Sequence, residues 1–190
     1  NAAIAANNCD IDCLEIHMSH GYLLHQFFSP ISNKRSDEYG GNLKNRCRLL
    51  LEIATEVRKI WPKNKILGAR VNGFDWVKKG STVSDCVYLA KKLEIIGFDY
   101  VCVTSGGILP KTNLKYKPGY QVFLAKKIKA KTKILVRVSG NLNYPNLLKK
   151  TVGKKIDFVA IGRAFLGNPR WIYDNFKSKN IPKQILRGFK

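Results

Sequence analysis

Two histidines and a tyrosine stand at the end of a short apolar segment near the N-terminus. Residues 13–16 read as a strand, His17 follows directly, and His20 and Tyr22 come shortly after it. A polar group just past the last apolar position lies at the carboxyl end of a strand. Local hydrogen bonds would satisfy a single histidine in such a connection. Two imidazoles and a phenol together favour a polar ligand, because titratable groups of this kind gather at functional sites.

One arginine interrupts the next apolar segment. Arg70 lies near the end of ILGARV, within a strand that we predict over 65–71. A buried guanidinium without a partner is costly, so we expect Arg70 to face an anion or an electron-rich ligand. The alternative is an arginine that solvent covers at the end of a strand.

Glycine-containing turns follow the last three predicted strands. They are Ser105-Gly106-Gly107 after 98–104, Ser139-Gly140-Asn141 after 133–138, and Gly162-Arg163 after 156–161. Backbone N–H groups at such turns, together with the start of the next helix, can bind a phosphate. Two such turns at consecutive strand ends are typical of the phosphate sites of (β/α)8 barrels.

Strands and helices alternate along the chain. After Tyr22 an aromatic, apolar turn leads to a polar loop with Gly40-Gly41. Helices are then predicted over 43–60, 84–96, 118 to about 130, 145–152 and after Pro169. Apolar residues recur at helical spacing within 43–60. Five short apolar strands that alternate with helices indicate an α/β fold with a parallel sheet.

Two parallel architectures are compatible with this alternation, a doubly wound sheet and a (β/α)8 TIM barrel. The glycine turns after the last two strands favour the barrel. The chain has about five βα units of the eight that a barrel needs. We therefore expect residues 1–190 to form one partial TIM-barrel domain. The opening segment, NAAIAANNCDID, reads as the end of a helix that leads into a strand, so the missing units would precede Asn1.

Composition narrows the class of protein. The chain has 190 residues, 45% of them hydrophobic, which is enough to bury a core. Its net charge is +21, but the lysines fall in scattered pairs on polar helix faces, without zinc or helix-turn-helix spacing. We expect no specific nucleic-acid partner, no bound metal and no membrane span. Five cysteines without a CxxC pair indicate a reduced, cytoplasmic protein.

One contiguous block resembles a known family. The segment IHMSHGYLLHQFFSPISNKRSDEYGGNLKNR is similar to the central signature of the old yellow enzymes, the FMN-dependent ene-reductases. It is closest to the subgroup with paired active-site histidines. The resemblance continues through Arg70, the segment PGYQ (118–121) and the segment IGR (161–163) to the C-terminus, and it covers the second part of the family's barrel.

The resemblance implies specific chemistry. NAD(P)H reduces the FMN, and an activated alkene of the enone type then takes hydride from it. His17 and His20 match the pair that hydrogen-bonds the substrate's carbonyl oxygen, and Tyr22 matches the proton donor. Arg70 matches the arginine beside the flavin's N1–C2 edge. The phosphate turns correspond to Ser139, Gly140, Gly162 and Arg163, and Ser105 and Gly106 would approach the ring or ribityl chain. The segment VNGFD after Arg70 departs from the family's pattern, which often has a serine there.

The C-terminal tail adds an expectation about assembly. Arg187 matches an arginine that reaches into the neighbouring subunit's active site in the His-pair subgroup, so the resemblance implies a homo-oligomer. A different class of function also fits the chain. It could be a truncated, catalytically inactive barrel remnant or interaction module that does not bind flavin. Flavin absorbance of the purified protein separates the two.

Overall fold

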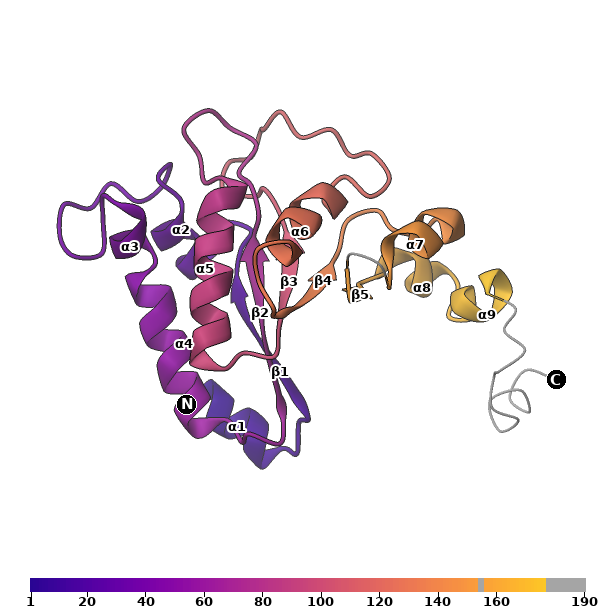
Figure 1. Cartoon of the computed structure of the whole chain (residues 1–190), viewed down its shortest axis with the longest axis horizontal. Helices are drawn as coiled ribbons and strands as arrows, with labels where there is room; N and C mark the ends of the chain where they lie inside the picture. Colours follow the sequence, from indigo (N-terminus) through magenta and orange to yellow (C-terminus); the bar gives the residue numbers. More distant parts are fainter. Residues whose placement is uncertain (154–155, 177–190) are drawn as a thin grey trace.

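The computed structural model describes residues 1–153 and 156–176. Within them, five parallel strands form one sheet in the order β1-β2-β3-β4-β5 (Figure 1). The strands are β1 (Cys13–Met18), β2 (Ile66–Asn72), β3 (Tyr100–Thr104), β4 (Leu135–Val138) and β5 (Phe158–Val159). A doubly wound sheet reverses its strand order at a switch point, whereas a barrel keeps sequence order. The sequential order therefore confirms the barrel-type α/β fold and excludes the doubly wound alternative.

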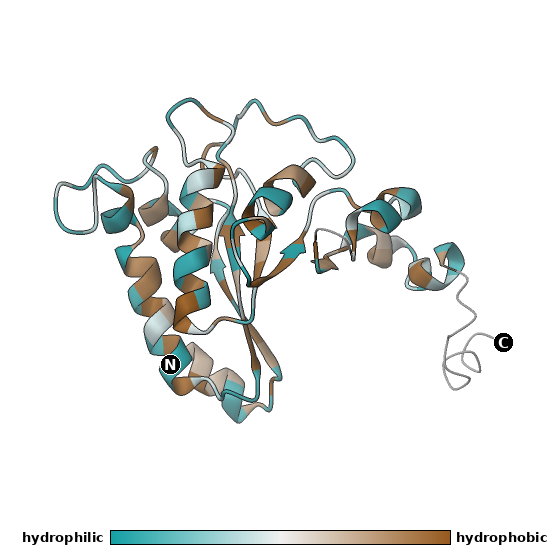
Figure 2. Ribbon diagram, viewed as in Figure 1, coloured by the Kyte–Doolittle hydropathy of each residue, from teal (hydrophilic) through white to brown (hydrophobic). Residues whose placement is uncertain are grey.

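Helices precede, connect and follow the strands. They are α1 (Ala2–Asn8), α2 (Leu23–Phe28), α3 (Leu43–Arg46), α4 (Arg48–Ile60), α5 (Val83–Ile96), α6 (Val122–Lys129), α7 (Pro145–Thr151), α8 (Arg163–Gly167) and α9 (Trp171–Asn175). In Figure 2, apolar and polar colours alternate along α4 and α5, as expected for helices with one side on a core. None of the helices in the described ranges is long and apolar enough to cross a membrane.

Alternate residues of each strand face the helices. Leu67, Ala69 and Val71 of β2 are fully buried in the core, and the valines of β3 and β4 pack beside them. The opposite face of the sheet carries polar side chains, because successive strand residues point to opposite sides. His17 pairs in register with Arg70, and Arg70 with Cys102, so these three residues form a row across that face.

Three local predictions were wrong or incomplete. The apolar residues after Tyr22 form the short helix α2 rather than a turn. The helix expected over 43–60 is interrupted at Cys47, which separates α3 from α4 but keeps right-handed helical dihedrals. The fifth strand, expected over 156–161, is reduced to two residues, because β5 pairs with β4 only at Phe158 and Val159.

The start of α5 shows how local chemistry fixes a boundary. The helix expected over 84–96 begins one residue earlier, at Val83, and its cap is Thr82. Its hydroxyl accepts a hydrogen bond from the Asp85 N–H, while the Asp85 carboxylate accepts one from the Thr82 N–H. This reciprocal capping box satisfies two donors that a helix start leaves unpaired.

Candidate active site

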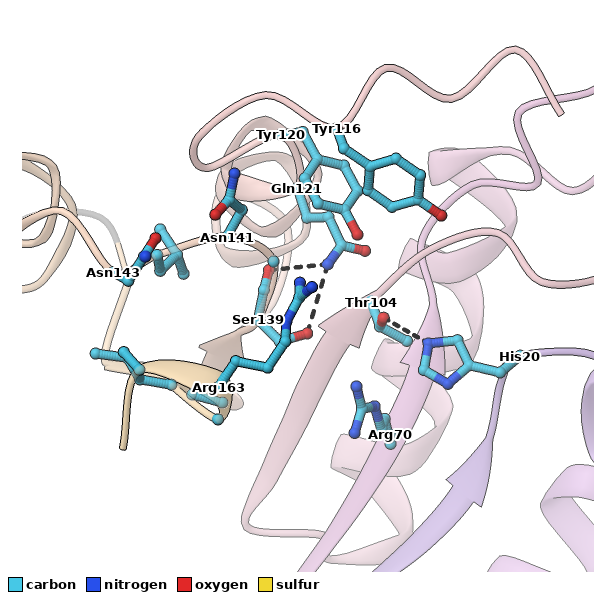
Figure 3. A pocket seen from close by; sticks show the side chains of 16 residues that line it. His20, Arg70, Thr104, Tyr116, Tyr120, Gln121, Ser139, Asn141, Asn143 and Arg163 are labelled. Atoms are coloured by element: carbon cyan, nitrogen blue, oxygen red, sulfur yellow. Dashed lines mark hydrogen bonds between the residues drawn. The ribbon is translucent and has the colours of Figure 1, made fainter. Parts of the chain in front are cut away.

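A cavity of about 930 Å³ opens at the carboxyl ends of the strands (Figure 3). Its walls come from the loop after β1, from β2 and β3, from the loop before α6, and from the turns after β4 and β5. Six of the residues that the sequence predicted for the site line this cavity. They are His20, Arg70, Ser139, Gly140, Gly162 and Arg163.

The two histidines and Tyr22 gather as the sequence suggested. The ring centroids of His17 and His20 are 5.3 Å apart, and those of His17 and Tyr22 are 5.0 Å apart. Only His20 of the three is among the residues that line the cavity. Tyr22 is 62% exposed, so its phenol lies at the surface of this cluster.

His20 is held by a strand-end residue. Its Nε2 lies 2.8 Å from Oγ1 of Thr104, the last residue of β3. Burial, and then the nearby Arg70 guanidinium, lower the pKa of His20 from 6.5 to about 4. Burial and Arg70 lower the pKa of His17 as well. Both imidazoles are therefore neutral at neutral pH, and each has one N–H to donate.

Arg70 projects from the middle of this polar face. Its Nε is buried and makes no hydrogen bond within the described residues. A buried N–H without a partner is rare and costly, so this atom indicates a missing acceptor. Arg70 also lies opposite His17 in the β1–β2 register. The site thus combines a fixed positive charge with neutral imidazole donors.

A chain of hydrogen bonds shapes the turn after β4. The Trp76 indole donates to the Ser105 hydroxyl at 2.8 Å, and that hydroxyl donates to Oε1 of Gln121 at 2.6 Å. Gln121 in turn donates to the Ser139 carbonyl oxygen at 2.9 Å. Gly140 follows with a φ of +113°, and a Cβ there would lie 2.4 Å from Nε2 of Gln121. Glycine is thus required at 140.

Two predicted residues lie away from the main cavity. Ser105 uses its hydroxyl between Trp76 and Gln121, and it lines a smaller cavity of about 570 Å³ that also borders His20. Gly106 lines neither cavity, and a Cβ there would contact the Trp76 ring at 3.5 Å. Ser105 therefore supports the turn after β4 through Gln121. That Ser105 and Gly106 approach the flavin ring or ribityl chain stays a prediction.

Positive charge faces the cavity from two directions. Figure 3 shows the Arg70 and Arg163 side chains directed into the same space. Tyr120 lies close enough for both guanidinium groups to affect the pKa of its phenol. Burial and the neighbouring Tyr116 raise the pKa of Tyr120, and the guanidinium groups of Arg163 and Arg70 oppose that rise. An anion in this space would meet both arginines.

Sequence reasoning missed several lining residues. Thr104, Tyr116, Tyr120, Gln121, Asn141 and Asn143 all contribute to the wall. The segment PGYQ was noted for its resemblance, and its last two residues supply Tyr120 and Gln121. The sequence alone offered no comparable signal for Thr104 or Tyr116. Arg187, expected to reach a partner's pocket, lies outside the described residues.

Known proteins resemble the chain over almost its whole length. The sequence profile of the NADH:flavin oxidoreductase / NADH oxidase family, whose members bind FMN, matches residues 1–180. The chain belongs to this family. An NADPH dehydrogenase of Clostridium acetobutylicum is 37% identical over 194 residues, which cover 99% of this chain and 57% of that protein.

Two solved structures share the fold of this chain. Morphinone reductase superposes with a TM-score of 0.69 at 25% identity, over 96% of this chain and 49% of the reductase. A 2-naphthoyl-CoA reductase superposes with a TM-score of 0.79 at 27% identity, over 98% of this chain and 28% of the reductase. The chain spans about half the length of the curated relatives it matches.

The residues present fit the family's cofactor, FMN. The phosphate requires cations and close backbone approach, which Arg163 and the glycine turns at 140 and 162 offer on one cavity. The flavin ring requires a cation near its anionic edge when reduced, and Arg70 lines the same cavity while its buried Nε has no hydrogen-bond partner within the described residues. FMN with NAD(P)H as reductant is the redox system of this family.

Proposed function

We propose that this chain supplies the FMN phosphate site and the substrate-oxygen site of an NAD(P)H-dependent reductase of activated alkenes. The observation that carries the proposal is one cavity bordered by His20, Arg70 and Arg163. A cation and a glycine turn at one end suit a phosphate, and neutral imidazoles at the other end suit a carbonyl oxygen. Bound FMN would supply the hydride, which no side chain of the protein can supply.

The histidines would act on the substrate's oxygen. Hydride addition to an enone builds negative charge on the carbonyl oxygen, and preorganised N–H donors stabilise that charge. Neutral His20 keeps one N–H, and its contact with the Thr104 hydroxyl restricts how the ring can turn. His17 lies near enough to donate to the same ligand, since the two ring centroids are 5.3 Å apart.

Tyr22 is the proposed proton donor to the other alkene carbon. A phenol can act as a general acid when it is close to the reacting atom. Its ring lies 5.0 Å from that of His17, on the exposed side of the cluster. A substrate that reaches past His20 toward His17 would therefore meet Tyr22 beyond the residues that line the cavity.

The names of the structural neighbours are compatible with this proposal. Both are reductases, one of morphinone and one in complex with 2-naphthoyl-CoA. The substrate proposed for this chain rests on the donor geometry at His17 and His20. Arg187 would complete the pocket of a second subunit in a homo-oligomer, which is part of the same proposal.

The first experiment tests the phosphate site on the purified chain. FMN and riboflavin are titrated separately, and binding is followed by flavin absorbance and fluorescence. We expect FMN to bind more tightly, and Arg163→Ala to weaken FMN by about tenfold, since one charge-assisted hydrogen bond contributes about 1.5–3 kcal/mol. Riboflavin binding should not change. Lys150→Ala, on the exposed side of α7, removes the same charge and should leave both affinities intact.

The flavin-loaded protein then tests the oxygen site. Phenol should perturb the flavin spectrum, and joint replacement of His17 and His20 by alanine should weaken phenol by roughly 2–4 kcal/mol without releasing FMN. Equal binding of FMN and riboflavin would contradict the phosphate site. A protein that binds neither flavin would instead support the alternative of a catalytically inactive module.

A further inference from the structure

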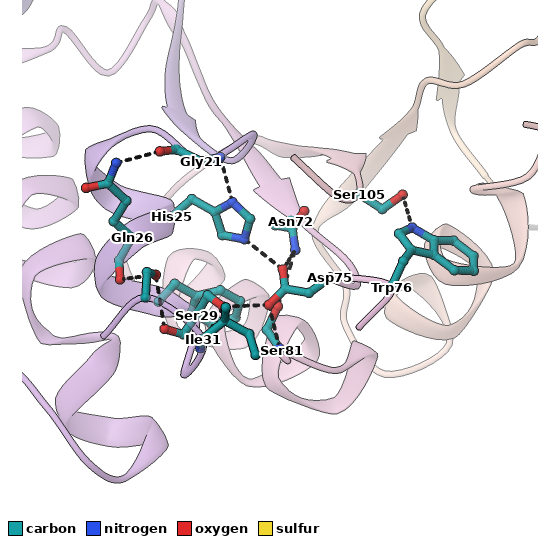
Figure 4. Close-up of polar contacts among 12 residues, drawn as sticks. Gly21, His25, Gln26, Ser29, Ile31, Asn72, Asp75, Trp76, Ser81 and Ser105 are labelled. Carbon is teal, nitrogen blue, oxygen red and sulfur yellow. Dashed lines mark hydrogen bonds and ion pairs between the residues drawn. The ribbon is translucent and has the colours of Figure 1, made fainter. Parts of the chain in front are cut away.

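The third histidine of the chain has no role in the site described above, yet it is completely buried. His25 lies in α2, and its side chain has no solvent exposure. Its Nε2 is 2.9 Å from Oδ1 of Asp75, which is equally buried in the loop after β2. Its Nδ1 accepts a hydrogen bond of 2.9 Å from the Gly21 N–H. Figure 4 shows both contacts.

These two bonds fix the state of the ring. Because Gly21 can only donate, Nδ1 of His25 must be an acceptor without a proton. The Nε2 atom then carries the proton, and this N–H donates a hydrogen bond to the Asp75 carboxylate. His25 is thus a neutral imidazole of defined tautomer, with both nitrogens engaged.

Asp75 joins the loop after β2 to α2. Its carboxylate accepts from His25 and from Nδ2 of Asn72 at 2.7 Å on one oxygen. The other oxygen accepts from the Ser29 hydroxyl and the Ser81 N–H, both at 2.6 Å. Burial alone would raise the pKa of Asp75, but the hydrogen bonds from His25, Ser29 and Ser81 outweigh it, and the pKa lies below its ordinary value. The carboxylate therefore stays charged and holds four donors.

The segment that His25 holds is the backbone of His20. His20 and Gly21 have φ values of +57° and +78°, and the left-handed region is unfavourable for histidine. The segment also lies against Gly107, because a Cβ on Gly21 would be 2.4 Å from the Gly107 oxygen. The Gly21 N–H bond to His25 is the contact that ties this strained segment to the buried Asp75.

We propose that His25, oriented by Asp75, is a positioning residue that holds the His20–Gly21 peptide and so presents the His20 imidazole to the cavity. The role of His20 in the cavity rests on the proposed function. Its geometry does not, because the hydrogen bond between His20 and Thr104 and the one from Gly21 N–H to His25 are formed by the chain's own residues. Remote groups of this kind matter where a donor must be placed within a fraction of an ångström.

The test replaces His25 in two ways. His25→Gln keeps one acceptor and one donor at the end of the side chain, whereas His25→Leu keeps the approximate volume and loses both. The matched control is Phe28→Leu, which removes buried volume from α2 without changing a polar side chain. The chain has three histidines, so the titration of each imidazole can be followed separately by NMR. The charged or titratable groups that act on His20 are Arg70, His17 and His25.

We expect His25→Leu to move the His20 titration upward, toward its ordinary value, because the ring would leave its buried place beside Thr104 and Arg70. His25→Gln should keep most of the wild-type value, and Phe28→Leu should keep all of it despite a loss of stability. If His25→Leu does not fold, Asp75→Asn replaces it. An amide there opposes a donor in either orientation, so it should also move the titration upward.

A second measurement uses the flavin-loaded protein. His25→Leu should weaken phenol by tenfold or more and leave the FMN affinity within twofold, while His25→Gln restores phenol binding. An unchanged His20 titration in His25→Leu or Asp75→Asn would overturn the proposal, as would an equal shift in Phe28→Leu. If the wild-type chain binds no FMN, the proposed function fails, and the NMR titration still decides the role of His25.

Discussion

At the scale of single residues, the site depends on imidazoles that stay neutral. Burial and Arg70 both disfavour a proton on His20, so its pKa falls to about 4. A protonated His20 would repel Arg70 in the same cavity. Arg70 lines the same cavity, and together with burial it keeps the neighbouring imidazoles as neutral donors across the physiological pH range.

This environment predicts how stability depends on pH. In the unfolded chain His20 titrates near 6.5, and in the folded chain it titrates near 4. Between these values the unfolded state binds more protons, so the free energy of unfolding falls as the pH drops from about 6.5 to about 4. His20→Asn, which tolerates a positive φ, should flatten that slope in urea unfolding measured at several pH values. Asp75 titrates below this window, since its pKa lies below 3.8. An unchanged slope in His20→Asn would contradict the lowered pKa.

What the sequence could predict at this scale depended on spacing. His17, His20 and Tyr22 lie close together in the chain, so one strand end brings them together. His25 belongs to the same segment, but its partner Asp75 lies 50 residues away, and no local sequence pattern predicts that bond. The same holds for Thr104 and His20, which are 84 residues apart. Residue roles that depend on tertiary partners were therefore missed.

At the scale of elements, the signature segment divides into a site part and a scaffold part. His20 enters the cavity, whereas Asn33 and Arg46 hold the loop that follows. The Asn33 amide donates to the carbonyl oxygens of Phe27 and Tyr39 at 2.6 and 2.8 Å. The buried Arg46 donates to those of Phe28 and Gly41 at 2.9 and 2.6 Å. Much of this segment thus serves to fix the loop between α2 and α3.

The sequence predicted the positions of the strands correctly, but it did not predict where the strands and helices end. Apolar runs bounded by polar turns located all five strands, because buried parallel strands carry little else. The length of a strand depends on how far it pairs with the adjacent strand, so the sequence of β5 could not predict that it ends after two residues. The helix α2 has no side-chain cap to mark its start, and its aromatic residues read equally well as a turn.

Packing between strands makes a second prediction. Gly68 of β2 faces Tyr100 of β3, and a Cβ at 68 would lie 2.2 Å from the tyrosine ring. The ring cannot move freely, since its hydroxyl donates to Glu15 of β1 at 2.9 Å. Gly68→Ala should therefore reduce the free energy of unfolding by about 1–3 kcal/mol, the usual cost of overpacking. Urea denaturation measures this.

A double-mutant cycle tests the cause of that loss. In a Tyr100→Leu background the ring is absent, so Gly68→Ala should cost at least about 1 kcal/mol less than in the wild type. Gly167→Ala is the control, because a Cβ there meets no atom within 4 Å. Equal costs in both backgrounds would show that the Tyr100 ring is not the obstacle.

At the scale of the whole molecule, the first three strands are paired and buried more extensively than the last part of the chain. β1 pairs with β2 over six residues and β2 with β3 over five, and the helix-facing side chains of β2 and β3 are buried. Beyond β4, by contrast, β5 has two residues, α8 has no buried residue, and α9 buries only Trp171. Segments with few buried apolar contacts open at lower free energy than the core. The proposed phosphate site lies on the boundary between these parts.

Hydrogen exchange should therefore report on FMN binding in a graded way. Without ligand, we expect amides of 158–176 to exchange faster than those of β2 and β3. FMN would contact Arg70 on the well-packed part and Gly162 and Arg163 on the other, so it should add protection mainly at 139–153 and 156–164. At 100 times its Kd, a ligand stabilises the native state by about 2.7 kcal/mol, which corresponds to about a hundredfold slower exchange where opening breaks the site. Riboflavin at the same saturation should protect the region near Arg70 and add little near Arg163. Uniform protection by both ligands would contradict a phosphate site that joins the two parts of the molecule.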